Sequence, residues 1–182
     1  MEDKWPRYVP VTFATGVNVS PEDLATLNRA KLPEIALGAG KILAVPIGIF
    51  IPDRGYLIQL AHGGYEGIYY DPSTGRVVAI HDWPGPDPRL VNSTLRQYTS
   101  TVKAITSAFP FYSKIESDLG EVETEARLNE REVIADRLGE LIREIDTAAM
   151  TPNNHWASFV TDVANGDYST ENVLREEDAD PG

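Results

Sequence analysis

The spacing of apolar residues divides the chain into two parts. Between residues 38 and 81 apolar residues form runs rich in β-branched and aromatic side chains, separated by Gly, Pro and Asp. After residue 92 they recur three or four positions apart. Runs bounded by turn residues are typical of strands, whereas the wider spacing is typical of helices with one apolar face. The pattern predicts a sheet followed in the chain by helices that cover one of its faces.

Four strands are predicted, over residues 42–51, 56–61, 67–70 and 76–81. Pro52-Asp53-Arg54-Gly55 separates the first two, so we expect adjacent antiparallel strands joined by a turn. The first run is apolar at almost every position, which predicts a strand covered on both faces. Pro46 inside it indicates a sheet edge or a bulge, because proline donates no hydrogen bond to a neighbouring strand.

A carboxylate stands in the turn between the third and fourth strands, in the sequence DPSTG from Asp71 to Gly75. Pro72 presets φ for a turn, Gly75 tolerates a positive φ, and the Asp71 side chain can accept N–H hydrogen bonds from the residues that follow it. No His, Ser or second acid stands at a spacing that would make Asp71 catalytic. The sequence therefore predicts that Asp71 caps the hairpin.

Two helices are predicted from their start signals. Ser20 and Pro21 begin a helix over about residues 21–30, because a serine hydroxyl accepts a free N–H group and proline suits the first helical position. Asn92 and Ser93 are the N-cap candidates of a second helix, which runs to about Ala108. The expected inward positions are Leu24 and Leu27 in the first, and Leu95, Tyr98, Val102 and Ile105 in the second.

Two more helices are predicted in the last third of the chain. One spans about residues 130–145, with acids on the face opposite its apolar stripe, and such a face is either solvated or suited to a basic partner. The last helix stops at Asn165-Gly166. The inward positions are Ile134, Leu138, Leu141, Ile142 and Ile145 in the first, and Trp156, Phe159, Val160 and Val163 in the second.

The net charge of −12 is distributed unevenly over the 182 residues. Residues 1–115 contain 10 acids and 11 Lys or Arg, whereas residues 116–182 contain 18 acids and 5 Arg. We expect this acid to lie mainly on the outer face of the helix over residues 130–145 and in the C-terminal tail. Acidic surface repels nucleic acids and anionic membranes and attracts basic proteins, although it also serves solubility alone.

Composition and length suggest a soluble globular protein with a single domain over residues 20–172, an N-terminal arm over residues 1–19 and a disordered acidic tail over residues 173–182. The chain has no cysteine, so no disulfide or thiolate site is possible. We expect no signal peptide, no transmembrane helix and a cytoplasmic location.

Catalytic signals are weak. The three histidines His62, His81 and His155 are far apart in the sequence and show no metal-ligand spacing, so we expect neither a metal nor a cofactor. A small hydrolase built on His81, Asp82 and His62 is one alternative, because His81 and Asp82 end the fourth strand and His62 ends a nearby one. No activated nucleophile accompanies these residues.

Three stretches within residues 20–172 carry a combined pattern: LIQLAHGGYEGIYYDPSTGRVVAI, LVNSTLRQYTSTVKAI and NNHWASFVTDVANGDYS. Together they resemble the fourth family of the SUKH immunity superfamily. The hairpin of that family matches at Asp71, Pro72, Thr74 and Gly75, and its helix start matches at Val91, Asn92, Ser93 and Leu95. Thr94 and Tyr98 depart from the family pattern, as does the longer acidic segment.

The resemblance implies an α+β fold, with a mainly antiparallel sheet of about four to six strands packed against helices. It also implies a bacterial immunity protein that binds and neutralises a toxin without catalysis. An acidic surface suits a basic toxin that acts on nucleic acid, because opposite charge speeds association. A protein-binding adaptor or regulator is the other alternative. The expected contact residues are Glu132, Asp136, Glu140, Tyr70, Trp83 and Asp87.

Overall fold

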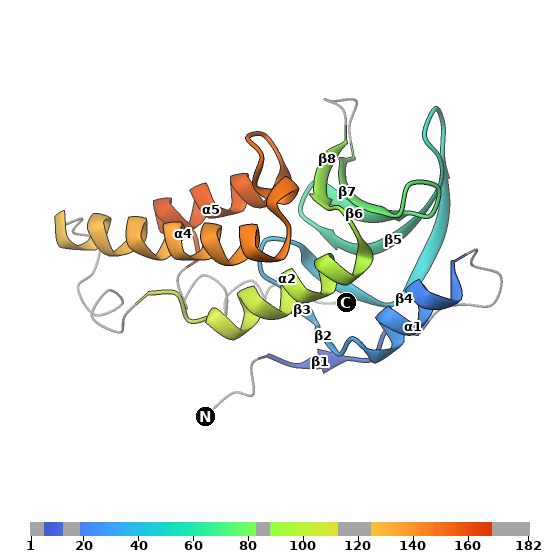
Figure 1. Ribbon diagram of the computed structural model, residues 1–182, viewed down its shortest axis with the longest axis horizontal. Helices are drawn as coiled ribbons and strands as arrows, with labels where there is room; N and C mark the ends of the chain where they lie inside the picture. Colours follow the sequence, from blue (N-terminus) through green and yellow to red (C-terminus); the bar gives the residue numbers. More distant parts are fainter. Residues whose placement is uncertain (1–5, 13–18, 83–87, 113–124, 169–182) are drawn as a thin grey trace.

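The computed structural model describes residues 6–12, 19–82, 88–112 and 125–168. In this part of the chain six strands form one curled antiparallel sheet, with four α-helices beside it (Figure 1). The α+β class implied by the resemblance is confirmed. The strands follow chain order across the sheet: β3 (Ile35–Ala36), β4 (Gly40–Ile51), β5 (Gly55–Gly63), β6 (Glu66–Asp71), β7 (Arg76–His81) and β8 (Arg89–Asn92).

The first predicted strand is confirmed, but its predicted burial on both faces is wrong. Along β4, Val45 is 53% exposed and Ile47 is 50% exposed. The reason is that β3 has only two residues, which pair with Gly40 and Lys41, so most of β4 has a described strand neighbour on one side only. The bulge indicated by Pro46 is confirmed, because the pairing of β4 with β5 shifts register between Ile42 and Ile47.

The hairpin between β6 and β7 is capped as predicted. The Asp71 carboxylate accepts hydrogen bonds from the Ser73 backbone N–H at 2.8 Å, the Ser73 hydroxyl at 2.6 Å and the Thr74 hydroxyl at 2.8 Å. Gly75 has φ 74°, a conformation that glycine adopts without strain. Burial raises the pKa of Asp71, but these hydrogen bonds more than offset it and the pKa is lowered. Asp71 is therefore a structural residue.

Two short regions differ from the prediction. The N-terminal arm, whose conformation the sequence left open, contributes β1 (Tyr8–Val9), which pairs with β2 (Leu32–Pro33). β8 (Arg89–Asn92) was not predicted. The N-cap of the next helix is Thr94, whose hydroxyl accepts from the Gln97 N–H at 3.2 Å, and not Asn92 or Ser93.

The four predicted helices are present: α1 (Pro21–Arg29), α2 (Leu95–Ala108), α4 (Glu125–Ile145) and α5 (His155–Asn165), with a short 3-10 helix, η1 (Thr147–Met150), before α5. Ser20 caps α1 through the N–H of Asp23. Gly166 ends α5 with φ 91°, and a Cβ there would lie 2.4 Å from the Arg131 guanidinium carbon. Glycine is thus required at this stop by both backbone and space.

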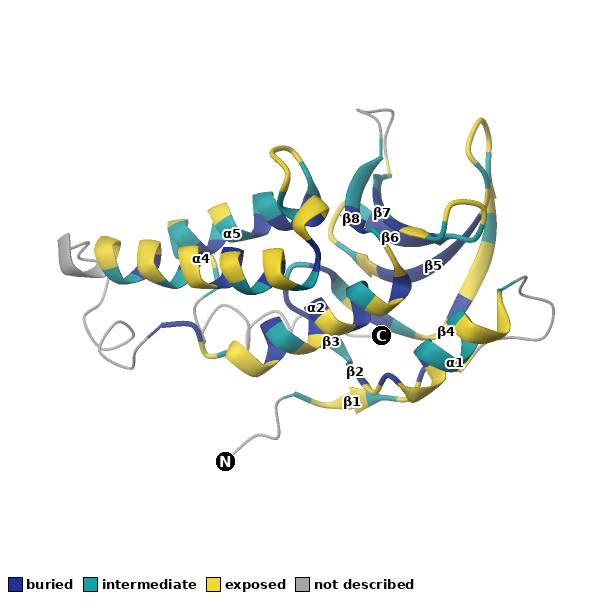
Figure 2. Cartoon of the chain, viewed as in Figure 1, coloured by how far each residue is buried: buried dark blue, intermediate teal, exposed yellow. Residues whose placement is uncertain are grey.

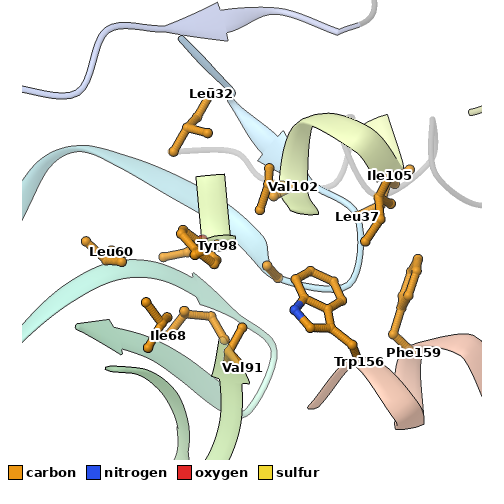
Figure 3. Close-up of a cluster of buried hydrophobic side chains, with 14 of the residues drawn as sticks. Leu32, Leu37, Leu60, Ile68, Val91, Tyr98, Val102, Ile105, Trp156 and Phe159 are labelled. Atoms are coloured by element: carbon orange, nitrogen blue, oxygen red, sulfur yellow. The ribbon is translucent and has the colours of Figure 1, made fainter. Parts of the chain in front are cut away.

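Residues from the sheet and the helices share one core (Figure 3). Tyr98 and Val102 of α2 face Ile68 of β6 and Val91 of β8, and Trp156 of α5 closes the cluster. Tyr98 and Trp156 are both 0% exposed. Burial of a large apolar side chain contributes about 1.5–3 kcal/mol relative to exposure, so these residues fix the helices on the sheet.

Candidate partner-binding surface

The outer face of α4 carries an exposed row of carboxylates. Glu132, Asp136 and Glu140 are four residues apart and all are exposed, whereas Leu138 and Ile142 on the opposite side are buried. Figure 2 shows exposed positions recurring along α4. Side chains four apart on a helix are neighbours, so the three carboxylates form one stripe. None of them makes an ion pair with another described residue. The stripe is free to meet cations of a partner.

Two exposed apolar side chains flank this row, and the sequence interpretation missed them. Leu128 is 42% exposed and lies one turn before Glu132, while Val133 is 66% exposed and lies one turn before Arg137. The sequence did contain a signal for them, because Leu128 and Val133 are apolar but do not belong to the predicted inward stripe of the helix. In such a surface the carboxylates can attract a basic partner, and the apolar side chains can supply contact area from which water is excluded. We call Leu128, Glu132, Val133, Asp136 and Glu140 the α4 patch.

The helix α4 as a whole carries less of the C-terminal acid than expected. α4 contains six acids and four arginines, a net charge of −2 against −13 for residues 116–182. The expectation that this acid lies mainly on the helix and in the tail is therefore wrong for the helix. Arg131 is 8% exposed and donates to the Asn165 carbonyl at 3.3 Å, so it does not neutralise the outer face.

The predicted aromatic anchors do not add to this surface. Tyr70 is 2% exposed, and its hydroxyl donates to the Asp23 carboxylate at 2.6 Å, so its assignment as a surface anchor is wrong. Tyr69 is also buried, at 8% exposure, because its ring lies in the space left open by Gly67. Trp83 and Asp87 lie outside the described residues.

The residues of the alternative hydrolase do not form one cluster. His62 pairs across the sheet with Gly67, and His81 pairs with Glu66. Because consecutive strand residues point to opposite faces, His62 and His81 lie on opposite faces of the sheet. His62 Nε2 is 3.4 Å from the Asp82 carboxylate, and both side chains are 47% exposed. The three residues therefore offer no shared catalytic centre.

The face of the sheet that carries His81 holds a separate charged cluster around Glu66. Its carboxylate contacts His155 Nδ1 at 2.8 Å, His81 Nε2 at 3.7 Å and the Arg89 guanidinium. Burial raises the pKa of Glu66, but the hydrogen bonds and charges of His155 and Arg89 outweigh it and lower the pKa to about 2. Arg89 also donates to the Ser158 hydroxyl at 3.1 Å. The cluster ties α5 to β6 and β8.

A second buried network surrounds Asp146, just after α4. Asp146 is 4% exposed and accepts from the Ser93 N–H at 2.6 Å, the Ser93 hydroxyl at 3.0 Å and the Asn92 side-chain amide at 3.3 Å. The Asn92 side-chain oxygen accepts from the Trp156 indole at 3.0 Å. The Asn-Ser pair and the late tryptophan of the family motifs therefore meet in one structural network.

The described residues offer little for catalysis. A pocket of about 210 Å³ lies between the β3–β4 turn and Gly63–Gly64, and the one acid in its lining is Glu66, whose carboxylate is already engaged. No group of three or more His, Asp or Glu in the described part of the chain is arranged to hold a metal ion. Within the same residues, no helix is both long and apolar enough to cross a membrane.

Residues 17–162 match the sequence profile of the SUKH-4 immunity proteins. The chain belongs to this family. No curated protein and no solved structure matches the sequence of this chain. The SUKH-4 profile covers the six-stranded sheet, α1, α2 and α4, and it extends into α5. Membership in an immunity-protein family implies neutralisation of a cognate toxin, and such proteins are typically not enzymes.

Proposed function

We propose that this SUKH-4 protein neutralises its toxin by direct binding in the cytoplasm, and that the toxin is basic and acts on nucleic acid. The observation that carries the proposal is the α4 patch, where Glu132, Asp136 and Glu140 are exposed and unpaired among the described residues. An enzyme that acts on nucleic acid presents cations to phosphates. A carboxylate stripe offers those cations an alternative partner.

The charge and the apolar side chains have different roles in this proposal. Long-range attraction raises the association rate and is screened by salt over about 8 Å at physiological ionic strength. Val133 and Leu128 act at short range, because burial of apolar side chains slows dissociation. Neutralisation then follows from occupation of the toxin surface and needs no catalytic residue.

Protection of cells from the toxin tests this function. The candidate toxin is the product of the neighbouring gene. It is expressed from an inducible promoter with and without the SUKH-4 protein, and the growth of the cells is measured. We expect the wild-type chain to restore growth and to co-purify with the toxin. Replacing Glu132, Asp136 and Glu140 by Lys should weaken both effects. An immunity protein that restores growth without binding the toxin would contradict neutralisation by binding.

A further inference from the structure

Among the described residues, the edge of β4 has no strand partner over much of its length. β3 pairs only with Gly40 and Lys41, the Ile42 N–H donates to the Glu34 carbonyl, and the Thr12 N–H donates to the Ala44 carbonyl. From Val45 to Ile51 no described strand pairs with this side of β4. Unpaired N–H and C=O groups on such an edge are a template for another strand.

This edge lacks the charges that protect most sheet edges. No charged residue occurs from Ile42 to Pro52. Natural edge strands are commonly blunted by lysine, proline or a bulge, and here Pro46 and its bulge protect only the first half. The remaining segment, Ile47 to Ile51, includes Ile47 at 50% exposure and Phe50 at 73% exposure. We call this segment the β4 edge.

Both faces of the β4 edge present apolar groups. Phe50 lies opposite Tyr56 of β5, which is 38% exposed. The Tyr56 side chain lies over Gly48, because a Cβ at Gly48 would be 2.0 Å from the Tyr56 hydroxyl oxygen. Phe50 and Tyr56 thus lie on one face of the sheet, while Ile47 projects from the other. A strand added to this edge would cover apolar side chains on both sides.

The charge around the β4 edge favours a second copy of this chain over a basic toxin. The segment is uncharged, and the neighbouring turn carries Asp53 and Arg54, whose charges cancel. A two-fold antiparallel pair of Ile47–Ile51 segments places only Ile, Phe and Gly opposite one another in any register. The acidic α4 patch lies at the other end of the molecule, so this pairing does not bring two acidic patches together (Figure 1).

We infer that the β4 edges of two copies pair antiparallel, so that the two sheets continue into one across a two-fold axis. The dimer leaves both α4 patches uncovered, and each copy can then bind its own toxin. The inference of this dimer does not depend on which toxin the protein binds.

Sedimentation velocity of the full chain at about 100 μM tests the pairing. We expect a dimer for the wild type and a monomer when Ile47 and Phe50 are both replaced by Lys. The matched control replaces Leu128 and Val133 by Lys, which adds the same charge at exposed apolar positions of α4 and should leave the dimer intact. Thermal melting checks that each variant is folded.

Cysteine cross-linking gives a second readout that does not depend on destabilising the edge. The chain has no native cysteine, so Ile49→Cys introduces a single thiol. Near a two-fold axis the two thiols should form a disulfide-linked dimer on mild oxidation, whereas Val133→Cys should not.

Three results would overturn the inference. One is a wild-type monomer at this concentration together with no Ile49→Cys cross-link. Another is a dimer that survives lysine at Ile47 and Phe50 in the folded variant. The third is a monomeric wild type whose melting temperature falls sharply in that variant, because the edge is then covered by the same chain.

Discussion

Asp136 and Asp146 are ten residues apart, yet they belong to regions with opposite properties. Asp136 lies on the outer face of α4, is exposed and makes no ion pair with a described residue. Asp146 is 4% exposed and accepts three hydrogen bonds from Asn92 and Ser93. A buried carboxylate must be fully paired to be tolerated, and an exposed one contributes little to folding. The buried acid therefore stabilises the fold, whereas the exposed one is available for the toxin binding proposed above.

The strongest test of this division is the removal of the buried acid. Asp146→Ala leaves the Ser93 N–H, the Ser93 hydroxyl and the Asn92 amide without their acceptor, and we expect it to lower the free energy of unfolding by about 3 kcal/mol. Asp136→Ala is the matched control on the exposed face and should change it by less than about 0.5 kcal/mol. Urea unfolding measures both values. If both variants lost the same free energy of unfolding, the distinction between a stabilising buried acid and an exposed acid would be contradicted.

Acid titration examines a second buried carboxylate. Against the effect of burial, His155 and Arg89 lower the pKa of Glu66 in the folded state to about 2, below the ordinary glutamate value of 4.5. Glu66 therefore contributes stability that is complete above pH 4.5 and is lost as the pH falls towards 2. The lowered pKa of Glu66 corresponds to a contribution of at most about 3 kcal/mol to the free energy of unfolding. Thermal melting across this range should show the loss.

Glu66→Gln is the control for that titration. It removes the ionisable group, so its melting temperature should start lower at neutral pH and fall less between pH 4.5 and 2. A variant whose melting curve keeps the full wild-type dependence on pH would show that Glu66 is not the group responsible.

Asp71 lies between the two extremes, since it is only partly buried but accepts several hydrogen bonds. We expect Asp71→Ala to lower the free energy of unfolding by about 1 kcal/mol, because the Ser73 and Thr74 donors lose their acceptor. Asp71→Asn keeps one oxygen acceptor and should lose less. Toxin binding by the folded variants should be unchanged, and a loss of binding at full stability would assign Asp71 to the interface.

Much of the fold could be predicted because local signals and tertiary packing agree. The Ser20-Pro21 start, the Asn165-Gly166 stop and the DPSTG turn each set backbone geometry through their own residues. The burial of β4 could not be predicted in this way. An uninterrupted apolar run shows that a strand can be covered, but coverage depends on whether neighbours extend along it, and β3 has only two residues.

The candidate site was only partly predictable for a similar reason. The acidic stripe of α4 follows from helical spacing, and the exposure of Glu132, Asp136 and Glu140 is confirmed. Tyr70 was misassigned because strand alternation distinguishes two faces but does not show that both are buried. The Asp146 network escaped prediction because it joins Asn92 and Ser93 to a residue more than 50 positions away. Such pairs follow from the topology and not from local pattern.

The association rate with the cognate toxin tests the role of the α4 patch most directly. Glu132→Lys with Asp136→Lys raises the net charge by four units, and so does the control pair Glu22→Lys with Asp82→Lys, at exposed acids of other elements. We expect the first pair, and not the control, to slow association several-fold at low salt, with little difference at about 1 M salt and no change in melting temperature. Equal slowing by both pairs, or by neither, would contradict binding through α4.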